Sequence, residues 1–540
     1  MSNFRNKSVN VNQFAMVTRP DVPRSSFKVQ QRHLTTFDAG YLIPIFVTEM
    51  LPGDTFNLRH TIFCRMSTPI YPVMDNLYLD TFYFAIPLRL LWTNFKKMMG
   101  EQANPSDSIA FTTPQQVSPA GGYAVGSLQD YLGLPTTPML GANTKSHSAF
   151  ATRAYNFTWN EHFRDENLQN SITFDTGDGP DATPSVNYVL RRRGKRKDYF
   201  TASLPWPQKG NSGVSVGLAG TAPVRGLGMA AAANYGYAGT ARETPNLTPT
   251  YAAASPVDIT GNRLYVEMGQ SGYPNIRTDL SAASGVLIND LRRAIMIQEL
   301  LELDARGGTR YTEIVQAHFG VMSPDSRLQR PEYLGGGSKM INVSPVAQTG
   351  QTGLTGGTTP LGTLGAIGTV VDHGNGFVYS ATEHMIILGL AAVRADLTYQ
   401  QGIHRMWTRQ TRYDYYWPSL AHLGEKAVRM DEIYCDGSAQ DTAVWGYQEA
   451  WSEYRYLPSR VSSLFRSTAS GTIDGWHLAQ KFTSAPTLND TFIQDTPPLS
   501  RVLAVGASAN GQQFIADMMF DVTMARPMPM YSVPQISSIL

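Results

Sequence analysis

The residues with the most obvious chemistry form a basic run, in which six positive charges fall within seven consecutive positions, 191–197. Tyr199 and Phe200 follow closely. Cations beside aromatic rings are typical of single-stranded nucleic-acid sites, because phosphates attract the cations and bases stack on the rings. A solvated charged loop, a patch of salt bridges between subunits and a nuclear-import signal are alternative interpretations. The candidate DNA-binding residues are Arg191, Arg192, Arg193, Lys195, Arg196, Lys197, Tyr199 and Phe200.

Other possible catalytic patterns are weak. Glu161, Asp165 and Glu166 cluster within WNEHFRDEN, but glycosidase carboxylates usually come from separate elements that face a cleft. Three acids beside Arg164 on one expected helix more often face solvent or form ion pairs. Residues 335–339 (GGGSK) do not complete a phosphate-binding GxxxxGK[ST] loop, and HExxH and CxxC are absent from the sequence. The ten histidines show no metal-binding spacing. We therefore expect no enzyme, no metal and no cofactor.

The composition limits the class of protein. Hydrophobic residues make up 42% of the 540 positions and charged residues 16%, below the roughly 25% typical of soluble domains. A surface with few charges loses little free energy when it is removed from water, which suits a subunit enclosed by neighbours. A large β protein with few charges would have the same composition. The net charge of +1 gives no overall positive electrostatic field that would attract nucleic acid. Cys64 and Cys435 are too few for a disulfide framework, which indicates a reducing compartment, although the two could still pair.

No targeting or membrane segment is expected. Residues 1–7 (MSNFRNK) do not resemble a secretory signal, and no apolar run approaches the ~20 residues of a membrane span. We expect a protein that is made in the cytoplasm and used without membrane insertion or secretion.

The elements that would position these residues are strands towards both ends of the chain. Residues 1–40 are polar and aperiodic, which favours an extended arm. Short apolar runs predict strands at 41–49, 55–66, 77–86 and 513–523. The third run is apolar on both faces, so we expect both faces to be buried. Helical spacing predicts helices at 88–100, 149–164 and 289–306, and a capping box at Ser127–Asp130.

Two long segments have unusual compositions. Residues 210–262 hold only four charges, and residues 341–371 hold none but contain seven glycines and seven threonines. Long loops of this kind are functional or disordered, and low charge argues against a solvated tail. We interpret them as loops that pack where several subunits meet.

Seven stretches together resemble the major capsid protein of the gokushoviruses, in the Microviridae. They occur in family order across nearly the whole chain: 41–56 (YLIPIFVTEMLPGDTF), 90–101 (LLWTNFKKMMGE), 153–168 (RAYNFTWNEHFRDENL), 194–210 (GKRKDYFTASLPWPQKG), 304–313 (DARGGTRYTE), 327–337 (RLQRPEYLGGG) and 447–461 (YQEAWSEYRYLPSRV). The two segments at 210–285 and 341–375 match the family least well.

The resemblance implies a mainly β fold, an eight-stranded viral jelly-roll sandwich with long loop and helix insertions. Residues 41–540 would form this domain after the 1–40 arm, with 210–285 as a surface protrusion at the three-fold axis and 341–375 as a Gly/Thr-rich loop. It also implies a T=1 shell of sixty copies, built through pentamers, and hence a place in the virion. Two rival interpretations are a carbohydrate-binding or glycosidase β-sandwich, which would be a monomer, and a nucleic-acid enzyme, which would need a metal or phosphate site that the sequence does not indicate.

The expected partners follow from the same resemblance and from charge. The family implies packaged circular single-stranded DNA, an internal scaffolding protein, a DNA pilot or minor capsid protein and a host receptor. Sixty copies at +1 supply roughly +60, whereas a genome that encodes 540 residues carries more than about 1,600 phosphates. Inward-facing runs at 191–197 would add only about 360 charges. We therefore also expect a small basic DNA-packaging protein.

Overall fold

The computed structural model describes residues 22–210, 224–225, 227–231, 262–266, 277–278, 288–349, 362–396, 398–505 and 513–531. The chain divides into two compact units: residues 1–207 together with 307–540, and residues 208–306. The first unit contains the sandwich and the candidate DNA-binding residues, whereas the second contains the whole of the segment at 210–285.

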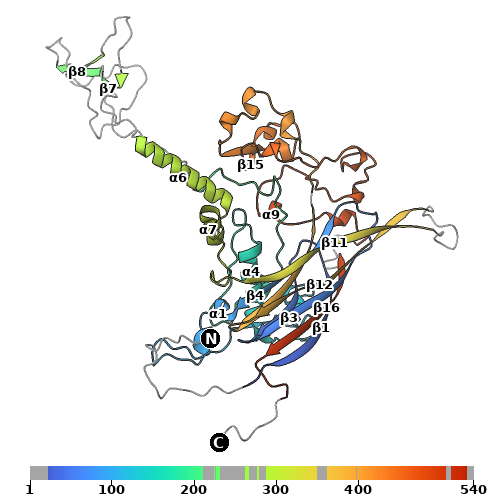
Figure 1. The fold of residues 1–540 in the computed structure, drawn as a ribbon. Helices are drawn as coiled ribbons and strands as arrows, with labels where there is room; N and C mark the ends of the chain where they lie inside the picture. Colours follow the sequence, from blue (N-terminus) through green and yellow to red (C-terminus); the bar gives the residue numbers. More distant parts are fainter. Residues whose placement is uncertain are drawn as a thin grey trace. The chain divides into compact units, whose positions relative to one another are not determined.

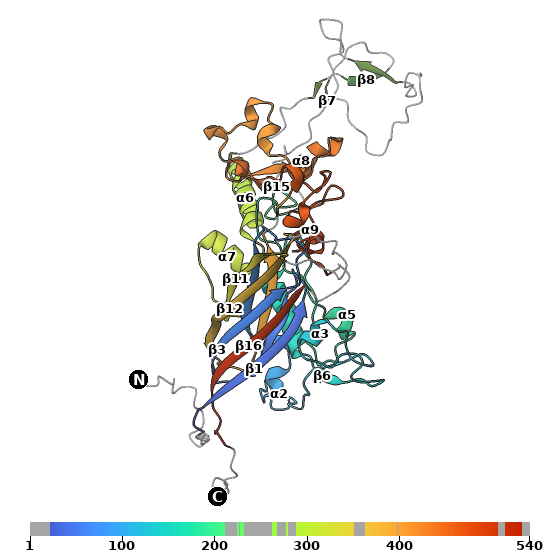
Figure 2. The same cartoon turned by 90° about the vertical axis from the view of Figure 1, so that its right-hand side faces the viewer.

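Eight antiparallel strands form the sandwich of the first unit. One layer holds β1 (Ser25–Phe37), β16 (Phe514–Arg526), β3 (Thr55–Met66) and β12 (Leu364–Ser380), side by side in that order in Figure 2. The other holds β11 (Glu332–Ala347), β4 (Leu77–Pro87), β13 (Met385–Ala395) and β2 (Ile43–Met50). The first part of β11 pairs with β4 and its end pairs with β12, so this strand connects the layers (Figure 1).

The apolar pattern of the strands decides which faces are buried. Side chains of β3 and β16 alternate between buried and exposed, so each strand contributes one face to the core. Phe46 of β2 and Phe520 of β16 pack with ring centroids 5.2 Å apart and join the two layers. By contrast, β4 and β13 are buried along almost their whole length. This confirms the prediction for 77–86, and the cause is an apolar cluster that packs on the outer face of these strands.

Long insertions after β4 and β13 carry the remaining elements of the first unit. The helices are α1 (Leu88–Leu91), α2 (Phe95–Met98), α3 (Leu128–Tyr131), α4 (Phe150–Thr158), α5 (Pro184–Asn187), α7 (Tyr311–Phe319), α8 (Met430–Ile433) and α9 (Asp490–Ile493). A π-helical turn at Trp159–Phe163 extends α4. The short strands are β5 (Gln115–Val117), β6 (Ser146–Ser148), β14 (Glu425–Arg429) and β15 (Val444–Glu449).

The helices predicted from spacing are largely confirmed. The Ser127 hydroxyl accepts a hydrogen bond from the Asp130 backbone N–H at 3.3 Å, which caps α3 as expected. The helix expected at 149–164 is α4 with its π-helical extension. The helix expected at 88–100 is instead two short helices, because the backbone at Trp92 is extended and its indole is buried, with Nε1 donating to Asp178.

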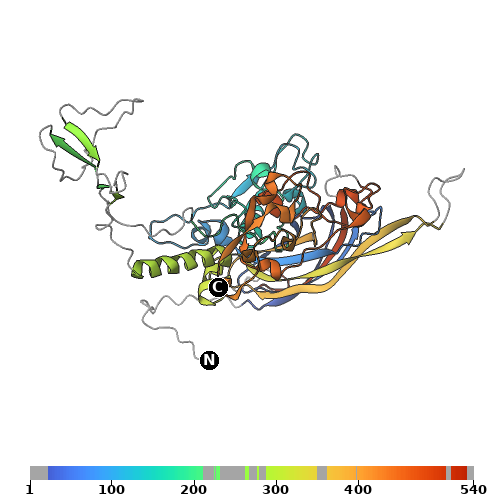
Figure 3. The ribbon, with the colours of Figure 1, turned by 90° about the horizontal axis from the view of Figure 1, so that it is seen from above.

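Two expectations about loops are corrected. The expected arm at 1–40 includes β1, which among the described strands pairs with β16 alone. Both faces of β1 are largely exposed, so its sequence shows no apolar period. The expected loop at 341–375 is mostly strand, the paired ends of β11 and β12 (the yellow pair in Figure 3). Glycine is required within β12, because a Cβ at Gly368 would lie 2.8 Å from the Met66 side chain. Residues 1–21 and 350–361 lie outside the described residues.

The second unit contains β7 (Val224–Arg225), β8 (Leu227–Ala231), β9 (Asn262–Val266), β10 (Arg277–Thr278) and nearly all of α6 (Ile288–Gly307). Strands β7 and β10 pair with each other, as do β8 and β9. The long helix α6 confirms the prediction for 289–306. None of the helices that the structure describes has both the length and the apolar character of a membrane span.

Candidate nucleic-acid interface

The basic run is a fixed segment, hydrogen-bonded on both sides. Its Arg191 carbonyl accepts from the Leu42 N–H at 3.0 Å, and its Arg193 N–H donates to the Gly40 carbonyl at 2.8 Å. On the other side, the Lys195 N–H donates to the Ile493 carbonyl at 2.7 Å. The backbone is therefore anchored between the start of β2 and the end of α9, which leaves only the side chains free to contact a ligand.

Two arginines of the run interact mainly with the protein itself. The Arg192 guanidinium lies 4.1 Å from the centre of the Tyr41 ring. Arg193 forms an ion pair with Asp80, which also accepts from Arg394 Nε at 2.7 Å. Burial alone would raise the pKa of Asp80, but hydrogen bonds from Ser338 and from these two arginines lower it overall. Asp80 is therefore a charged anchor for both guanidiniums.

Lys195 is the most deeply buried cation of the run. Its Nζ donates to Gln480 Oε1 at 2.9 Å and lies 4.1 Å from the centre of the Phe492 ring. Burial lowers the pKa of Lys195 to about 8. This side chain therefore supports the local structure, as does Arg191, whose guanidinium lies 6.0 Å from the Trp159 ring.

The remaining two cations are exposed. The Arg196 side chain is 71% exposed and lies 3.6 Å from Asp396, whereas Lys197 is 58% exposed and pairs with Asp165. Ion pairs at exposed positions are weak, about 0.2–1 kcal/mol, and a phosphate can displace them. Arg196 and Lys197 are thus the members of the run best placed to meet a ligand.

The two aromatic residues of the prediction are not placed to stack on bases. Tyr199 and Phe200 are both buried. The Tyr199 ring stacks on Tyr456 at 5.0 Å, and its hydroxyl donates to Glu432 at 2.8 Å. Phe200 packs edge-on against Trp445. The expectation is corrected for these two rings, because they form the core of a separate apolar cluster.

A hollow of about 510 Å³ lies over the exposed cations. Asp165 is the one acidic residue of its lining. The cations that line it come from several parts of the chain: Arg164, Arg193, Lys195, Arg196, Lys197 and Arg394. We call it the basic hollow. Arg164 and Arg394 could not be assigned to this group from the sequence, because they lie beside the run only in the folded chain. A concave surface with this balance of charge suits a phosphate.

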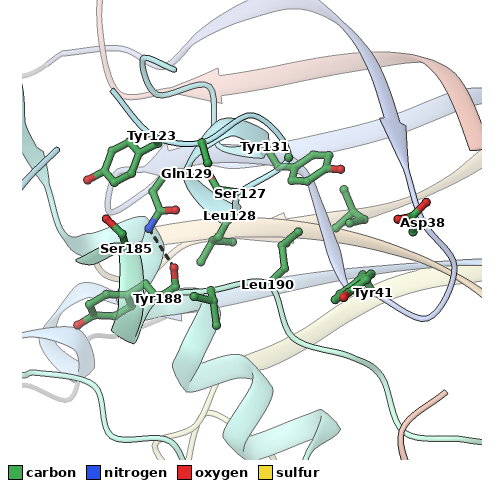
Figure 4. Close-up of a pocket in the computed structure, with 14 residues that line it drawn as sticks. Asp38, Tyr41, Tyr123, Ser127, Leu128, Gln129, Tyr131, Ser185, Tyr188 and Leu190 are labelled. Carbon is green, nitrogen blue, oxygen red and sulfur yellow. Dashed lines mark hydrogen bonds between the residues drawn. The ribbon is translucent and has the colours of Figure 1, made fainter. Parts of the chain in front are cut away.

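A second cavity has a different character. It has a volume of about 310 Å³ and is lined by four tyrosines, small residues, apolar side chains and Asp38 (Figure 4). The Gln129 amide, which also lines it, donates to the carbonyls of Pro184 and Tyr188 at 3.2 and 3.0 Å. No Lys or Arg is among its lining residues, so it does not suit a phosphate.

Two of the three acids of the cluster at 161–166 form ion pairs. Asp165 pairs with Lys197, and Glu166 pairs with Arg310 and accepts from the Thr309 hydroxyl at 2.7 Å. Burial favours the neutral form of Glu166, but these partners lower its pKa overall. Within the described ranges, no group of three or more His, Cys, Asp or Glu side chains could hold a metal ion.

The arrangement of the strands defines the class of protein. Eight antiparallel strands in two layers, with the last strand placed between the first and the third, form a jelly roll, a fold common to viral capsid domains. Residues 15–536 match the family model described as capsid protein (F protein). The chain belongs to this phage capsid protein family.

Individual relatives cover the same full length. The chain is 42% identical to capsid protein VP1 of Chlamydia phage 1, over 98% of this chain and 99% of the relative. Identity to capsid protein VP1 of Bdellovibrio phage phiMH2K is also 42%, over 97% and 98%. Identity to capsid protein VP1 of Spiroplasma virus 4 is 35%, over 98% of both. The protein is therefore a structural component of a virion rather than an enzyme.

Proposed function

We propose that the protein assembles into a T=1 shell of sixty copies, through pentamers, around a circular single-stranded DNA genome. The full-length match to capsid proteins named VP1 carries this proposal. The low proportion of charged residues supports it, since permanent interfaces tend to be large and apolar. Assembly is tested by sizing the purified protein: a megadalton particle supports the shell, whereas a stable species near 59.4 kDa contradicts it.

We propose that the basic hollow faces the packaged DNA. Arg196 and Lys197 provide exposed charge, and Arg164 and Arg394 extend the positive surface. Replacing both Arg196 and Lys197 by Gln should lower the DNA content of particles while empty shells still form. The matched control is Arg32→Gln, which removes an exposed cation from the edge strand β1. Unchanged DNA content in the double variant would contradict the proposal, and loss of all assembly would favour a salt-bridge patch between subunits.

We also propose that residues 210–285 form a protrusion at the three-fold axis that attaches to a host receptor. The whole of this segment falls within the second compact unit, which supports an insertion that folds separately from the sandwich. Deleting 215–275 should leave a folded subunit and particles that no longer adsorb to host cells. An insoluble, unfolded deletion variant would show that the segment belongs to the core.

The remaining partners are proposed from charge and family. The net charge of the shell and the cations of the runs at 191–197 offset only a minority of the DNA phosphates, so a small basic DNA-packaging protein should accompany the genome. Mass spectrometry of purified filled particles should find a short Lys- and Arg-rich polypeptide in many copies, and its absence would contradict this expectation. An internal scaffolding protein and a DNA pilot protein are proposed on family grounds alone.

A further inference from the structure

A third concave site, with a volume of about 410 Å³, is formed by residues that follow the basic run in the sequence. It is lined mainly by residues of two segments, 398–407 and 456–466, with Phe200 and Glu432. Both segments belong to the part of the first unit drawn in orange shades in Figure 1. We call it the aromatic cleft. Its volume is typical of small-ligand sites, which range over about 300–1,000 Å³.

Aromatic rings form rigid walls for this cleft. Tyr456 is held by its stack on Tyr199, and Tyr399 is held by edge-on packing against Phe200 with centroids 5.2 Å apart. Trp407, which also lines the cleft, ends a 3-10 helical turn that is capped by His404. The Trp407 residue is 73% exposed. An exposed indole beside fixed rings offers a platform on which a planar ligand can stack.

The charge of the cleft favours an anionic ligand. Arg460 and Arg466 line it and are exposed, and neither has an acidic partner within the part of the chain that the structure describes. The one acid in the lining, Glu432, is already neutralised: it pairs with Arg405 at 3.2 Å and accepts from the Tyr199 hydroxyl. Two guanidiniums beside aromatic walls combine the groups that bind phosphates and bases.

Two polar atoms of the lining residues also lack partners. Tyr399 Oη and His404 Nε2 are buried, and neither forms a hydrogen bond to any described residue. A buried polar group without a partner costs about 1–3 kcal/mol. The backbone of Ser463, in the loop that carries Arg460 and Arg466, is left-handed at φ 56°, a conformation that is strained outside glycine.

The aromatic cleft adjoins the basic run. Tyr399 lines both the cleft and a smaller hollow of about 300 Å³, whose other lining residues include 195–198. The Lys195 ammonium lies 5.7 Å from the centre of the Tyr399 ring. The cations at 195–197 and the aromatic cleft therefore lie on two sides of the same Tyr399 residue.

We propose that the aromatic cleft binds nucleotides of single-stranded DNA, with a base stacked on Trp407 and neighbouring phosphates on Arg460 and Arg466. The inference rests on the proposed packaging of DNA and names a second contact that the basic run does not provide. Because every base can stack and every nucleotide carries a phosphate, we expect the affinity to depend little on base sequence.

The test uses the full-length, unassembled protein and a fluorescently labelled ten-nucleotide oligothymidylate, with binding measured by anisotropy. Trp407→Leu should weaken binding at least about fivefold, the smallest effect expected for loss of one stacked base. Trp417→Leu, which removes a half-exposed indole outside the cleft, is the control and should stay within twofold. Circular dichroism and thermal unfolding verify that each variant is folded.

Two further measurements separate stacking from charge. An abasic oligomer with the same number of phosphates should bind more weakly than oligothymidylate, and Trp407→Leu should not weaken its binding further. Replacing both Arg460 and Arg466 by Gln should reduce the slope of log affinity against log salt by about 1.4, as expected for two lost phosphate contacts. Arg412→Gln is the control for this charge change.

Three outcomes would overturn the proposal. The first is equal affinity of the wild-type and Trp407→Leu proteins for oligothymidylate, and the second is no binding of either oligomer by the wild type. The third is a Trp407→Leu protein that binds normally but forms no particles, which would make the cleft a contact between copies. Failure of the proposed shell is distinguishable, because it appears as an absence of wild-type particles on sizing.

Discussion

Arg153 offers a stringent test of how the insertion after β4 is held together. Its guanidinium is buried on α4, where Nε donates to Asp181 Oδ2 at 3.0 Å. Its Nη1 donates to the carbonyls of Leu91 and Gly177 at 3.0 and 3.1 Å, and its Nη2 donates to Asp181 Oδ1. Replacing Arg153 by Met keeps an unbranched apolar stem but removes every one of these donors.

The expected loss in the free energy of unfolding is about 3–5 kcal/mol, the usual cost of leaving one partner of a buried ion pair uncompensated. Asp181 keeps hydrogen bonds from Gln116 at 3.0 Å and Tyr188 at 2.8 Å, which places the expected loss towards the lower end of this range. A double variant that also carries Asp181→Leu should recover part of the loss, because it removes the stranded carboxylate.

The matched control is Arg32→Met on β1. Arg32 pairs with Asp517 at 2.7 Å, but the two side chains are 58% and 41% exposed, so its loss should cost less than about 1 kcal/mol. Urea unfolding of the unassembled protein, followed by tryptophan fluorescence, measures both variants. A difference of less than 1 kcal/mol between the two variants would refute the view that burial gives the Arg153 pair its importance.

The pH dependence supplies an independent check. Burial alone would raise the pKa of Asp181, but hydrogen bonds from Arg153, Gln116 and Tyr188 lower it overall. A carboxylate with a lowered pKa stabilises the fold above its unfolded pKa, and this contribution is lost as pH falls through the folded pKa. The difference in the free energy of unfolding between the wild type and Arg153→Met should therefore be at its full value at pH 7 and decrease at acidic pH.

Three further predictions follow from other buried groups. Tyr83→Phe removes the hydroxyl that hydrogen-bonds to Nδ1 of buried His60 at 2.7 Å, and urea unfolding should show a loss of about 1–3 kcal/mol; no loss would mean that the ring has another partner. Burial raises the pKa of Asp495 to about 7, so the wild type should lose stability relative to Asp495→Asn as pH rises from 5 to 8. An equal change of the free energy of unfolding with pH in the two proteins would contradict this. Burial raises the pKa of the Cys64 thiol to about 12, so a thiol-alkylating reagent should modify Cys435 before Cys64, as peptide mass spectrometry can establish.

The strands that could be predicted from sequence are those with a clear apolar pattern. The alternating residues of β3 and the continuous apolar residues of β4 leave few alternatives, and both strands were placed to within a residue or two. By contrast, β1 was missed because a strand with one neighbour and two exposed faces has no apolar period. The ends of β11 and β12 were missed because small, uncharged residues are more typical of loops than of strands.

The candidate site shows the same limit. A run of charge is visible in sequence, but the positions of the side chains depend on distant residues, such as the Asp80 carboxylate beside Arg193. The aromatic cleft was missed because about fifty residues separate its two main segments. The alternation of Arg with Trp and Tyr at 405–417 was a usable signal, since it fits the same nucleic-acid criterion as the run at 191–197.

The position of β16 has a consequence for how the chain is made. This strand pairs with β1 along all thirteen of its residues and with β3 on its other edge. At about 5–20 residues per second, a ribosome needs roughly 25–90 s to travel from β3 to β16. Throughout that interval β1 and β3 have a strand-wide gap between them, so the layer cannot close. An interrupted chain keeps that gap and cannot present a finished subunit to its neighbours, so translation to residue 526 is itself a checkpoint for entry into a particle.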